Sequence, residues 1–238
     1  RLVLERLGVD DYGVYSVVGG IVTILSFLNG TMSSATSRFI SYELGGGDTG
    51  RLHRTFASSM KVHIALAAIV LLLAETAGLW YVNSRLVIDP SRISAANATY
   101  QLSIVAAMAA IIQVPYSAAI MSHERMDAYA AIAVVNVLLK LGAALGIALF
   151  ATSDSLTGYA ALMTIAAIAV AAMYAAYARR HFPECRTVRT SDRGILRDML
   201  AFCGWDVYGN LCYTSRVQGT IVVLNRFGGT ALNAAGGL

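Results

Sequence analysis

Five long apolar stretches follow one another along the chain, and Lys and Arg residues crowd into every second gap between them. A helix needs about 20 apolar residues to cross the hydrocarbon of a bilayer. Three stretches lack Asp, Glu, Lys and Arg, and the other two contain one such residue each. The pattern predicts an all-α polytopic membrane protein with spans at Tyr12–Ser37, Val62–Val82, Ile93–Ser122, Ala128–Ser153 and Ser155–Ala178.

The composition also favours a membrane protein. Hydrophobic residues make up 57% of the chain and charged residues only 13%, whereas a soluble domain has roughly 25% charged residues. A soluble protein that buried five such helices would need far more chain to cover them. A sixth stretch, Met199–Asn225, is also long and apolar, although it contains Asp206 and Arg216. We expect it to be a further span.

The positions of Lys and Arg predict the orientation of the spans. Three gaps on one side, Arg38–Lys61, His123–Asp127 and Arg179–Arg197, hold eleven of the 18 Lys and Arg residues, and the other side holds five. Positively charged loops remain in the cytoplasm, so these three gaps are predicted to face it. The net charge of +4 then follows from topology. No basic helix interleaved with aromatic residues indicates a nucleic-acid partner.

Glycines and the chain ends give further expectations. No Gly-Lys-Ser/Thr follows Gly45–Gly47, so these glycines indicate the end of a helix rather than a phosphate-binding loop. We predict one long helix over Tyr12–Leu44. The chain begins at Arg1 rather than Met and ends in a Gly-rich turn, and we interpret it as an internal fragment of a longer protein. The cysteines show no CxxC spacing, which indicates structural thiols.

The longest basic gap, Arg179–Arg197, ends in an amphipathic pattern. Apolar residues such as Ile195 and Met199 are interspersed with Arg193 and Arg197, which is typical of a short helix on the membrane surface. The gap is either a boundary between two helical lobes or an ordinary positively charged loop. We predict first-lobe helices in residues 1–178, a cytoplasmic amphipathic linker in 179–198 and the start of a second lobe in 199–238.

Two spans carry features that point to packing or movement. In the first span, polar residues recur every three or four positions on one helical face, and Arg38 extends this stripe toward the cytoplasm. The stripe either forms a hydrated surface that faces a substrate or allows close packing of helices, which small residues permit. Pro115 is predicted to kink its helix, because proline frees a carbonyl. The stripe consists of Thr23, Ser26, Asn29, Ser33 and Ser37.

Ionisable groups within spans are costly and usually functional. Lys140 lies near the middle of its span, with Asn136 one turn earlier on the same face. Arg216 lies mid-span in the sixth stretch, and Asn210 lies nearer its cytoplasmic end. These groups indicate either a hydrated cavity with a cationic floor or a set of interhelical ion pairs, for example between Glu75 and Lys140.

Four short motifs, taken together and in order, resemble those of a known transporter family. They are Leu7–Tyr15, Ser33–Phe39, His123–Met126 and Asn233–Ala235. They resemble the polysaccharide transporter family, the flippases of O-antigen and other lipid-linked oligosaccharides within the multidrug/oligosaccharidyl-lipid/polysaccharide superfamily. The resemblance implies two lobes of six helices around a cavity that opens alternately to either side. The chain would then hold the tail of helix 1, helices 2 to 6 and helix 7.

The resemblance also implies a function. Such a protein flips a polyprenyl-pyrophosphate-linked oligosaccharide across the bacterial cytoplasmic (inner) membrane and is not an enzyme. Its partners would be the lipid bilayer, the lipid-linked oligosaccharide and proteins of polysaccharide assembly, with no cofactor, metal or nucleic acid. The planar guanidinium of arginine can donate hydrogen bonds to two phosphate oxygens at once. Cationic side chains are therefore expected to bind the pyrophosphate. The candidate substrate-binding residues are Arg216, Lys140, Arg38, Asn210 and Asn29.

Two other functions stay open. A multidrug exporter of the same superfamily, driven by Na⁺ or H⁺, would need an acidic residue in the first lobe, where Glu75 is the only carboxylate within a span. A membrane-embedded glycosyltransferase or ligase would use paired carboxylates as base and metal ligand. Asp10 and Asp11 imitate such a pair, but they also suit the start of the helix that follows.

Overall fold

The computed structural model describes most of the chain, and the described part is helical without strands. The chain divides into two compact units, Arg1–Met199 and Leu200–Leu238. The described residues are 13, 15–16, 32–84, 89, 92–149, 155–186, 191–206, 208–209, 212–213 and 215–216.

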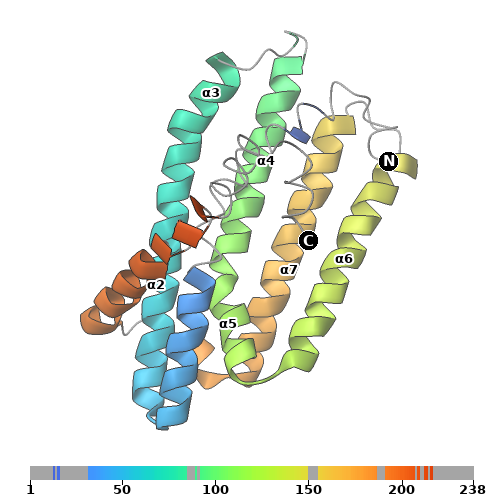
Figure 1. Cartoon of the computed structure of the whole chain (residues 1–238). Coiled ribbons are helices and arrows are strands. Elements are labelled where there is room, and N and C mark those ends of the chain that lie inside the picture. Colours follow the sequence, from blue (N-terminus) through green and yellow to red (C-terminus); the bar gives the residue numbers. More distant parts are fainter. Residues whose placement is uncertain are drawn as a thin grey trace, which may run out of the picture. The chain divides into compact units, whose positions relative to one another are not determined.

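In chain order, the named elements of the described part lie between two further helices (Figure 1). The first covers residues 32–46 and the last covers residues 193–206. Between them lie α2 (Thr49–Leu73), a π-helical turn (Ala74–Gly78), α3 (Leu79–Ser84), α4 (Ile93–Ile112), α5 (Val114–Ser122), α6 (Met126–Leu149), α7 (Ser155–His181) and a 3₁₀ turn (Pro183–Arg186).

Four of the described helices are long and apolar enough to cross a membrane. This finding confirms four predicted spans and the all-α membrane class. The predicted spans Tyr12–Ser37 and Met199–Asn225 lie largely outside the described residues. The two-lobe flippase arrangement and the domain bounds stay predictions. The four helices are Thr49–Ser84, Ile93–Ser122, Met126–Ile147 and Ser155–His181.

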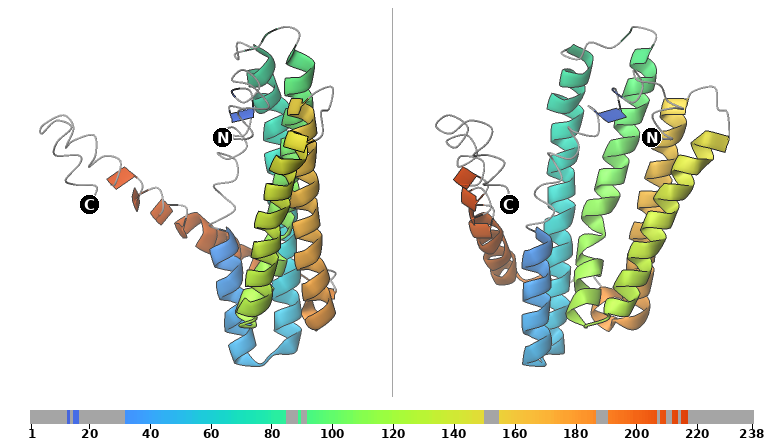
Figure 2. Two further views of the ribbon diagram at one scale, coloured as in Figure 1. Left: turned by 90° about the vertical axis from the view of Figure 1, so that its right-hand side faces the viewer. Right: turned by 45° about the vertical axis from the view of Figure 1, so that its right-hand side comes forward.

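The helices of the first unit alternate in direction, as the charges predict. They pack side by side in the order α2, α4, α7, α6, so that α7 inserts between α4 and α6 (Figures 1 and 2). The turn at Gly47, the loop at His123–Arg125 and the 3₁₀ turn all lie at one end, which we call the inner end. The three basic gaps therefore share one end of the unit. Its assignment to the cytoplasm stays a prediction.

A tight turn joins the first described helix to α2 at the inner end. Gly47 adopts a positive φ of 71°, a conformation that glycine reaches without strain. The Asp48 side chain then caps α2 by accepting the Arg51 amide at 3.0 Å, and this hydrogen bond lowers the pKa of Asp48. Arg51 also forms an ion pair of 3.2 Å with the buried carboxylate of Glu43. The glycines end the helix as predicted, and residues 17–31 lie outside the described part.

The sequence predicts helix in the gap Arg38–Lys61 only as far as Leu44, whereas α2 already begins at Thr49, before the predicted span at Val62. Nearly all of this gap is helical, and only the turn at Gly47 and Asp48 is not. The continuous rod Thr49–Ser84 has 36 residues, about 54 Å at 1.5 Å per residue, whereas the hydrocarbon is about 30 Å thick. Charged residues mark where a helix leaves the membrane, and here the helices continue well beyond that point.

Pro115 interrupts its helix as predicted. The regular helix breaks between α4 and α5 at Gln113. Proline has no N–H to donate to the carbonyl four residues earlier. Helical hydrogen bonding resumes at the Gln113 carbonyl, which accepts hydrogen bonds from the backbone amides of Tyr116 at 3.1 Å and Ser117 at 3.0 Å.

The inner half of the first unit holds its largest apolar core. Phe56 of α2 packs on Tyr116 of α5, with ring centroids 5.5 Å apart. Arg179 of α7 lies over the same Tyr116 ring and donates to its hydroxyl at 2.9 Å. Ile40, Ala119, Ile132, Tyr174 and Phe182 bring the other inner helix ends into this cluster.

The helix of residues 193–206 begins at an anchor on α2. The Asp192 amide donates to the Ser58 hydroxyl at 3.1 Å, and Lys61 donates to the Ser191 hydroxyl at 2.6 Å. Met199 is fully buried, while Arg193 is exposed. The predicted amphipathic pattern is therefore present. The helix continues to residue 206 rather than ending before the sixth stretch.

Cysteine labelling tests the assignment of the inner end to the cytoplasm. In intact cells, a cysteine at Gly46 should resist an impermeant thiol reagent in a background without the native cysteines. A cysteine at Ser84, which is exposed at the other end of the rod, should react. Gly46 is chosen because a side chain there meets no other atom within 4 Å. The reverse labelling pattern would overturn the orientation.

Candidate functional site

Lys140 is the most unusual cation in the first unit. It lies on α6 fourteen residues after Met126, about 21 Å along the helix axis, which is mid-membrane for a spanning helix. Its side chain is exposed, and no hydrogen bond or ion pair joins it to another described residue. The alternative in which Lys140 pairs with Glu75 is therefore absent from the described part.

The other predicted substrate-binding residues do not form one described site with Lys140. Arg38 is exposed on the helix of residues 32–46, about 13 Å before the Gly47 turn. Arg216 belongs to the second unit, where its guanidinium lies 5.7 Å from the centre of the Tyr213 ring. Asn29 and Asn210 lie outside the described residues. The joint role of these five residues stays a prediction.

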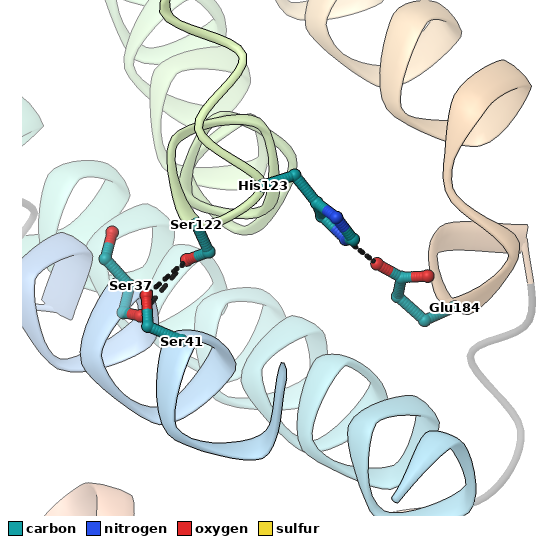
Figure 3. Close-up of polar contacts among 5 residues, drawn as sticks. All are labelled: Ser37, Ser41, Ser122, His123 and Glu184. Carbon is teal, nitrogen blue, oxygen red and sulfur yellow. Dashed lines mark hydrogen bonds and ion pairs between the residues drawn. The ribbon is translucent and has the colours of Figure 1, made fainter. Parts of the chain in front are cut away.

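Residues beside the described part of the polar stripe join neighbouring helices. At the inner end, the Ser41 hydroxyl donates to the Ser122 hydroxyl at 3.1 Å, and Ser122 donates to the Ser37 carbonyl at 3.1 Å (Figure 3). The neighbouring Thr36 is fully buried and shares a hydrogen bond of 3.0 Å with Ser59 of α2. These contacts show close helix packing beside the stripe, in which Ser37 takes part through its backbone carbonyl.

Glu75 has a neutral partner across the bundle. Its Oε2 accepts a hydrogen bond of 3.1 Å from Nε2 of Gln101 on α4. The carboxyl is only partly buried. One turn of π-helix, Ala74–Gly78, contains it, and such turns often occur at functional sites.

Tyr100 explains why the helix widens at this point. Its side chain is fully buried, and its hydroxyl donates to the Ala74 carbonyl at 2.8 Å. A Cβ at Gly78 would lie 1.9 Å from that hydroxyl oxygen, so only glycine leaves room for it. Farther toward the outer end, Asn83 and Asn97 exchange amide hydrogen bonds of 3.2 and 2.9 Å. Polar contacts therefore join the π-helical turn and α3 to the outer half of α4.

Alanine at Gly78 tests this close contact. Gly78→Ala should lower the free energy of unfolding by about 1–3 kcal/mol, the usual cost of overpacking, measured by thermal unfolding in detergent. The double variant Gly78→Ala/Tyr100→Phe should recover part of the loss, because the clashing hydroxyl is gone. Gly142→Ala is the matched control, since a Cβ there meets nothing within 4 Å. Equal losses in Gly78→Ala and Gly142→Ala would contradict the contact.

His63 is a buried titratable residue that the sequence analysis missed. It is fully buried on α2, and its Nδ1 lies 2.9 Å from the Ser59 carbonyl. Because a carbonyl only accepts, Nδ1 carries the hydrogen. The Nε2 atom, like the Thr55 hydroxyl, has no hydrogen-bond partner among the described residues. The spacing of four residues from Thr55 to Ser59 to His63 was a readable signal of one helical face.

His123 and Glu184 form a second polar contact at the inner end. The His123 Nε2 lies 2.5 Å from the Glu184 carboxylate, which is 4% exposed (Figure 3). The imidazole also stacks on Phe182, with ring centroids 4.0 Å apart and planes within 5°. The pair ties the α5–α6 loop to the 3₁₀ turn after α7. Burial raises the pKa of the adjacent Cys185 thiol, and the Glu184 charge raises it further, so this thiol is poorly suited to nucleophilic chemistry.

The rest of the His123–Met126 motif shapes the loop. Glu124 adopts a positive φ of 57°, which is uncommon for a residue with a side chain. Arg125 donates two hydrogen bonds of 3.1 Å to Asp127, and this carboxylate raises the pKa of the guanidinium. The Arg125 side chain also lies over the Tyr177 ring at 5.8 Å. The motif therefore builds a compact inner loop, and its described members do not line a cavity with Lys140.

An apolar groove of about 620 Å³ lies between α6 and α7. Glycines hollow it on both sides, and leucines such as Leu138 and Leu162 border it. This groove is not the predicted hydrated cavity, because its lining is apolar.

Compared with known protein families, with curated proteins and with solved structures, the chain matches none of them.

Proposed function

We propose that the chain belongs to a transporter that flips a polyprenyl-pyrophosphate-linked oligosaccharide across the bacterial cytoplasmic membrane by alternating access. Several spanning helices, basic residues gathered at one end and the four ordered motifs support the proposal. Such a lipid serves surface polysaccharide or O-antigen synthesis. The partners are the bilayer, the lipid-linked oligosaccharide and proteins of polysaccharide assembly.

The position of Lys140 near the middle of a spanning helix is the observation on which the proposal rests. A charged side chain at the middle of a span is costly, and such residues usually mark a substrate or ion pathway. Lys140 is exposed at this depth and has no counter-charge among the described residues. A pyrophosphate that crosses the membrane needs a cation at such a position, because its own charge is otherwise unbalanced in the hydrocarbon.

The mechanism requires few cations rather than many. Ion pairing is stronger in a medium of low dielectric constant than in water, so one or two cations hold the anion during crossing. A dense cluster would hold it too tightly to release it. In this mechanism Arg38 attracts the headgroup at the inner side and Lys140 binds it at depth in the first unit. Arg216 is a separate candidate for binding the headgroup in the second unit. No covalent step is involved.

Replacing Lys140 tests the proposal in cells. Lys140→Ala should reduce export of the glycan at least several-fold, and Lys140→Arg should retain much of it because the charge remains. The measurement is surface glycan in a complemented deletion strain, together with the amount of protein in the membrane. Leu141→Ala is the matched control, since Leu141 is also exposed on α6. Normal export by Lys140→Ala at normal abundance would contradict a role in transport.

A further inference from the structure

Arg193 and Arg197 form an exposed pair of cations on the helix of residues 193–206. Both side chains are exposed, and their spacing of four residues puts them on one face of the helix. Neither forms a hydrogen bond or an ion pair with another described residue. Like charges at this spacing repel each other and destabilise a helix. The arginine pair therefore has no favourable contact within the described part of the chain.

The nearby carboxylates do not balance the arginine pair. Asp192 accepts the Gly194 amide at 2.7 Å, so it caps the start of the helix. Asp198 is exposed and lies about 100° around the helix axis from Arg197, on a different face. Both guanidinium groups are therefore accessible to an anion from outside the protein.

The arginine pair is held in a fixed place beside α2. The Asp192 amide donates to the Ser58 hydroxyl at 3.1 Å, and this hydroxyl donates to the Asp192 carbonyl at 3.4 Å. Ser58 is fully buried. On the opposite face of the helix from the arginine pair, Ile195 and Met199 are also buried. Packing therefore orients this helix so that the two arginines point away from the protein.

Lys61 brings a third cation to this part of the first unit. It donates to the hydroxyl of Ser191 at 2.6 Å, two residues before Arg193, and its ammonium has further N–H donors. Ser84 follows Lys61 by 23 residues, about 35 Å along the rod, whereas the hydrocarbon is about 30 Å thick. Lys61 therefore lies at the level of the lipid headgroups.

An exposed apolar stripe begins beside Lys61 on α2. Its members follow Lys61 by three, seven and eleven residues, a spacing that keeps them on the same helical face. A cationic group at the membrane surface, followed by an apolar stripe that runs into the hydrocarbon, is complementary to an anion with long hydrocarbon chains. The stripe consists of Ile64, Ala68 and Leu72, which are all exposed.

We propose that the arginine pair and Lys61 bind the headgroup of an anionic phospholipid, whose acyl chains lie along the apolar stripe of α2. Guanidinium groups donate to two phosphate oxygens at once, and basic residues next to a spanning helix attract anionic lipids. Binding is non-covalent and relieves the repulsion within the arginine pair. The inference does not depend on the proposed cargo.

Native mass spectrometry of the purified full chain tests the proposal. In detergent with equal amounts of phosphatidylglycerol and phosphatidylcholine, the wild type should retain phosphatidylglycerol at least several-fold more than phosphatidylcholine. Arg197→Ala should lose most of this preference, and Arg197→Lys should keep part of it. Arg180→Ala is the matched control, because it removes one exposed cation from the inner end but lies outside the arginine pair. It should keep the preference.

Thermal unfolding separates a lipid site from a site for free anions. Phosphatidylglycerol should raise the Tm of the wild type, because a ligand that binds only the folded state stabilises it. The rise should be smaller in Arg197→Ala, whose Tm without lipid should not be lower than that of the wild type. Inorganic phosphate should not reproduce the rise.

Three outcomes would overturn the proposal. Equal retention of the two lipids by the wild type would exclude a site selective for anionic lipid, and this result needs no variant. Equal losses of the preference in Arg197→Ala and Arg180→Ala would show a general effect of charge. A Tm increase with inorganic phosphate as large as that with phosphatidylglycerol would assign the cations to a free anion.

Discussion

His123→Ala should lower the free energy of unfolding by about 3 kcal/mol, the upper end of the usual cost of leaving a buried polar group without its hydrogen bond. Glu184 is the reason, because its carboxylate is 4% exposed and contacts the imidazole. The alanine also removes the stacking on Phe182. Thermal unfolding of the full chain in detergent should show the loss as a clear decrease in Tm.

A double variant separates the unsatisfied carboxyl from the lost packing. His123→Ala/Glu184→Leu should recover much of the stability, because no unsatisfied polar group remains buried at this position. His123→Gln should cost less than His123→Ala, since an amide still donates to the carboxylate. A Tm for His123→Ala equal to that of the wild type would show that Glu184 does not depend on His123.

Arg216→Ala should abolish export of the glycan while the protein remains in the membrane. The expectation follows from the mid-span position of Arg216 in the sixth predicted stretch, where a guanidinium pairs two oxygens of a pyrophosphate. Arg216→Lys should retain part of the activity, because the charge remains and the planar fork is lost. The assay is surface glycan measured alongside membrane abundance in a complemented deletion strain.

The control for this variant is Tyr213→Phe. Tyr213 lies under the Arg216 guanidinium, and phenylalanine keeps a ring beneath the charge while removing the hydroxyl. We expect Tyr213→Phe to export normally. Full export by Arg216→Ala at normal abundance would show that the cation does not bind substrate. Loss of the protein from the membrane would instead indicate a structural ion pair.

The spans were readable from the sequence because hydrophobicity and charge act locally. The predicted span Ile93–Ser122 has the bounds of the observed one, and the predicted start at Ser155 is also correct. The sequence did not indicate that α2 begins at Thr49, well before the predicted span at Val62. The charges there report the edge of the hydrocarbon, and helical hydrogen bonding continues beyond it.

The polar contacts were not readable, because they join residues far apart in sequence. Gln101 lies 26 positions after Glu75, and no local pattern pairs them. Glu184 lies in a basic linker that suggested an exposed loop, yet packing around Phe182 and Cys185 buries it. His63 lies at the inner edge of the predicted span Val62–Val82, and only the packing of the helices shows that it is buried.

Transbilayer movement of the lipid itself is the most direct test of the proposed function. The full-length protein would be placed in vesicles that contain a labelled polyprenyl-pyrophosphate oligosaccharide, and an impermeant glycan-cleaving enzyme would be added outside. In empty vesicles about half of the label should be protected. With the wild type, the external enzyme should cleave nearly all of the label. With Arg216→Ala, about half of the label should remain protected, as in empty vesicles. Equal protection with wild-type protein and with no protein would contradict flipping of this lipid.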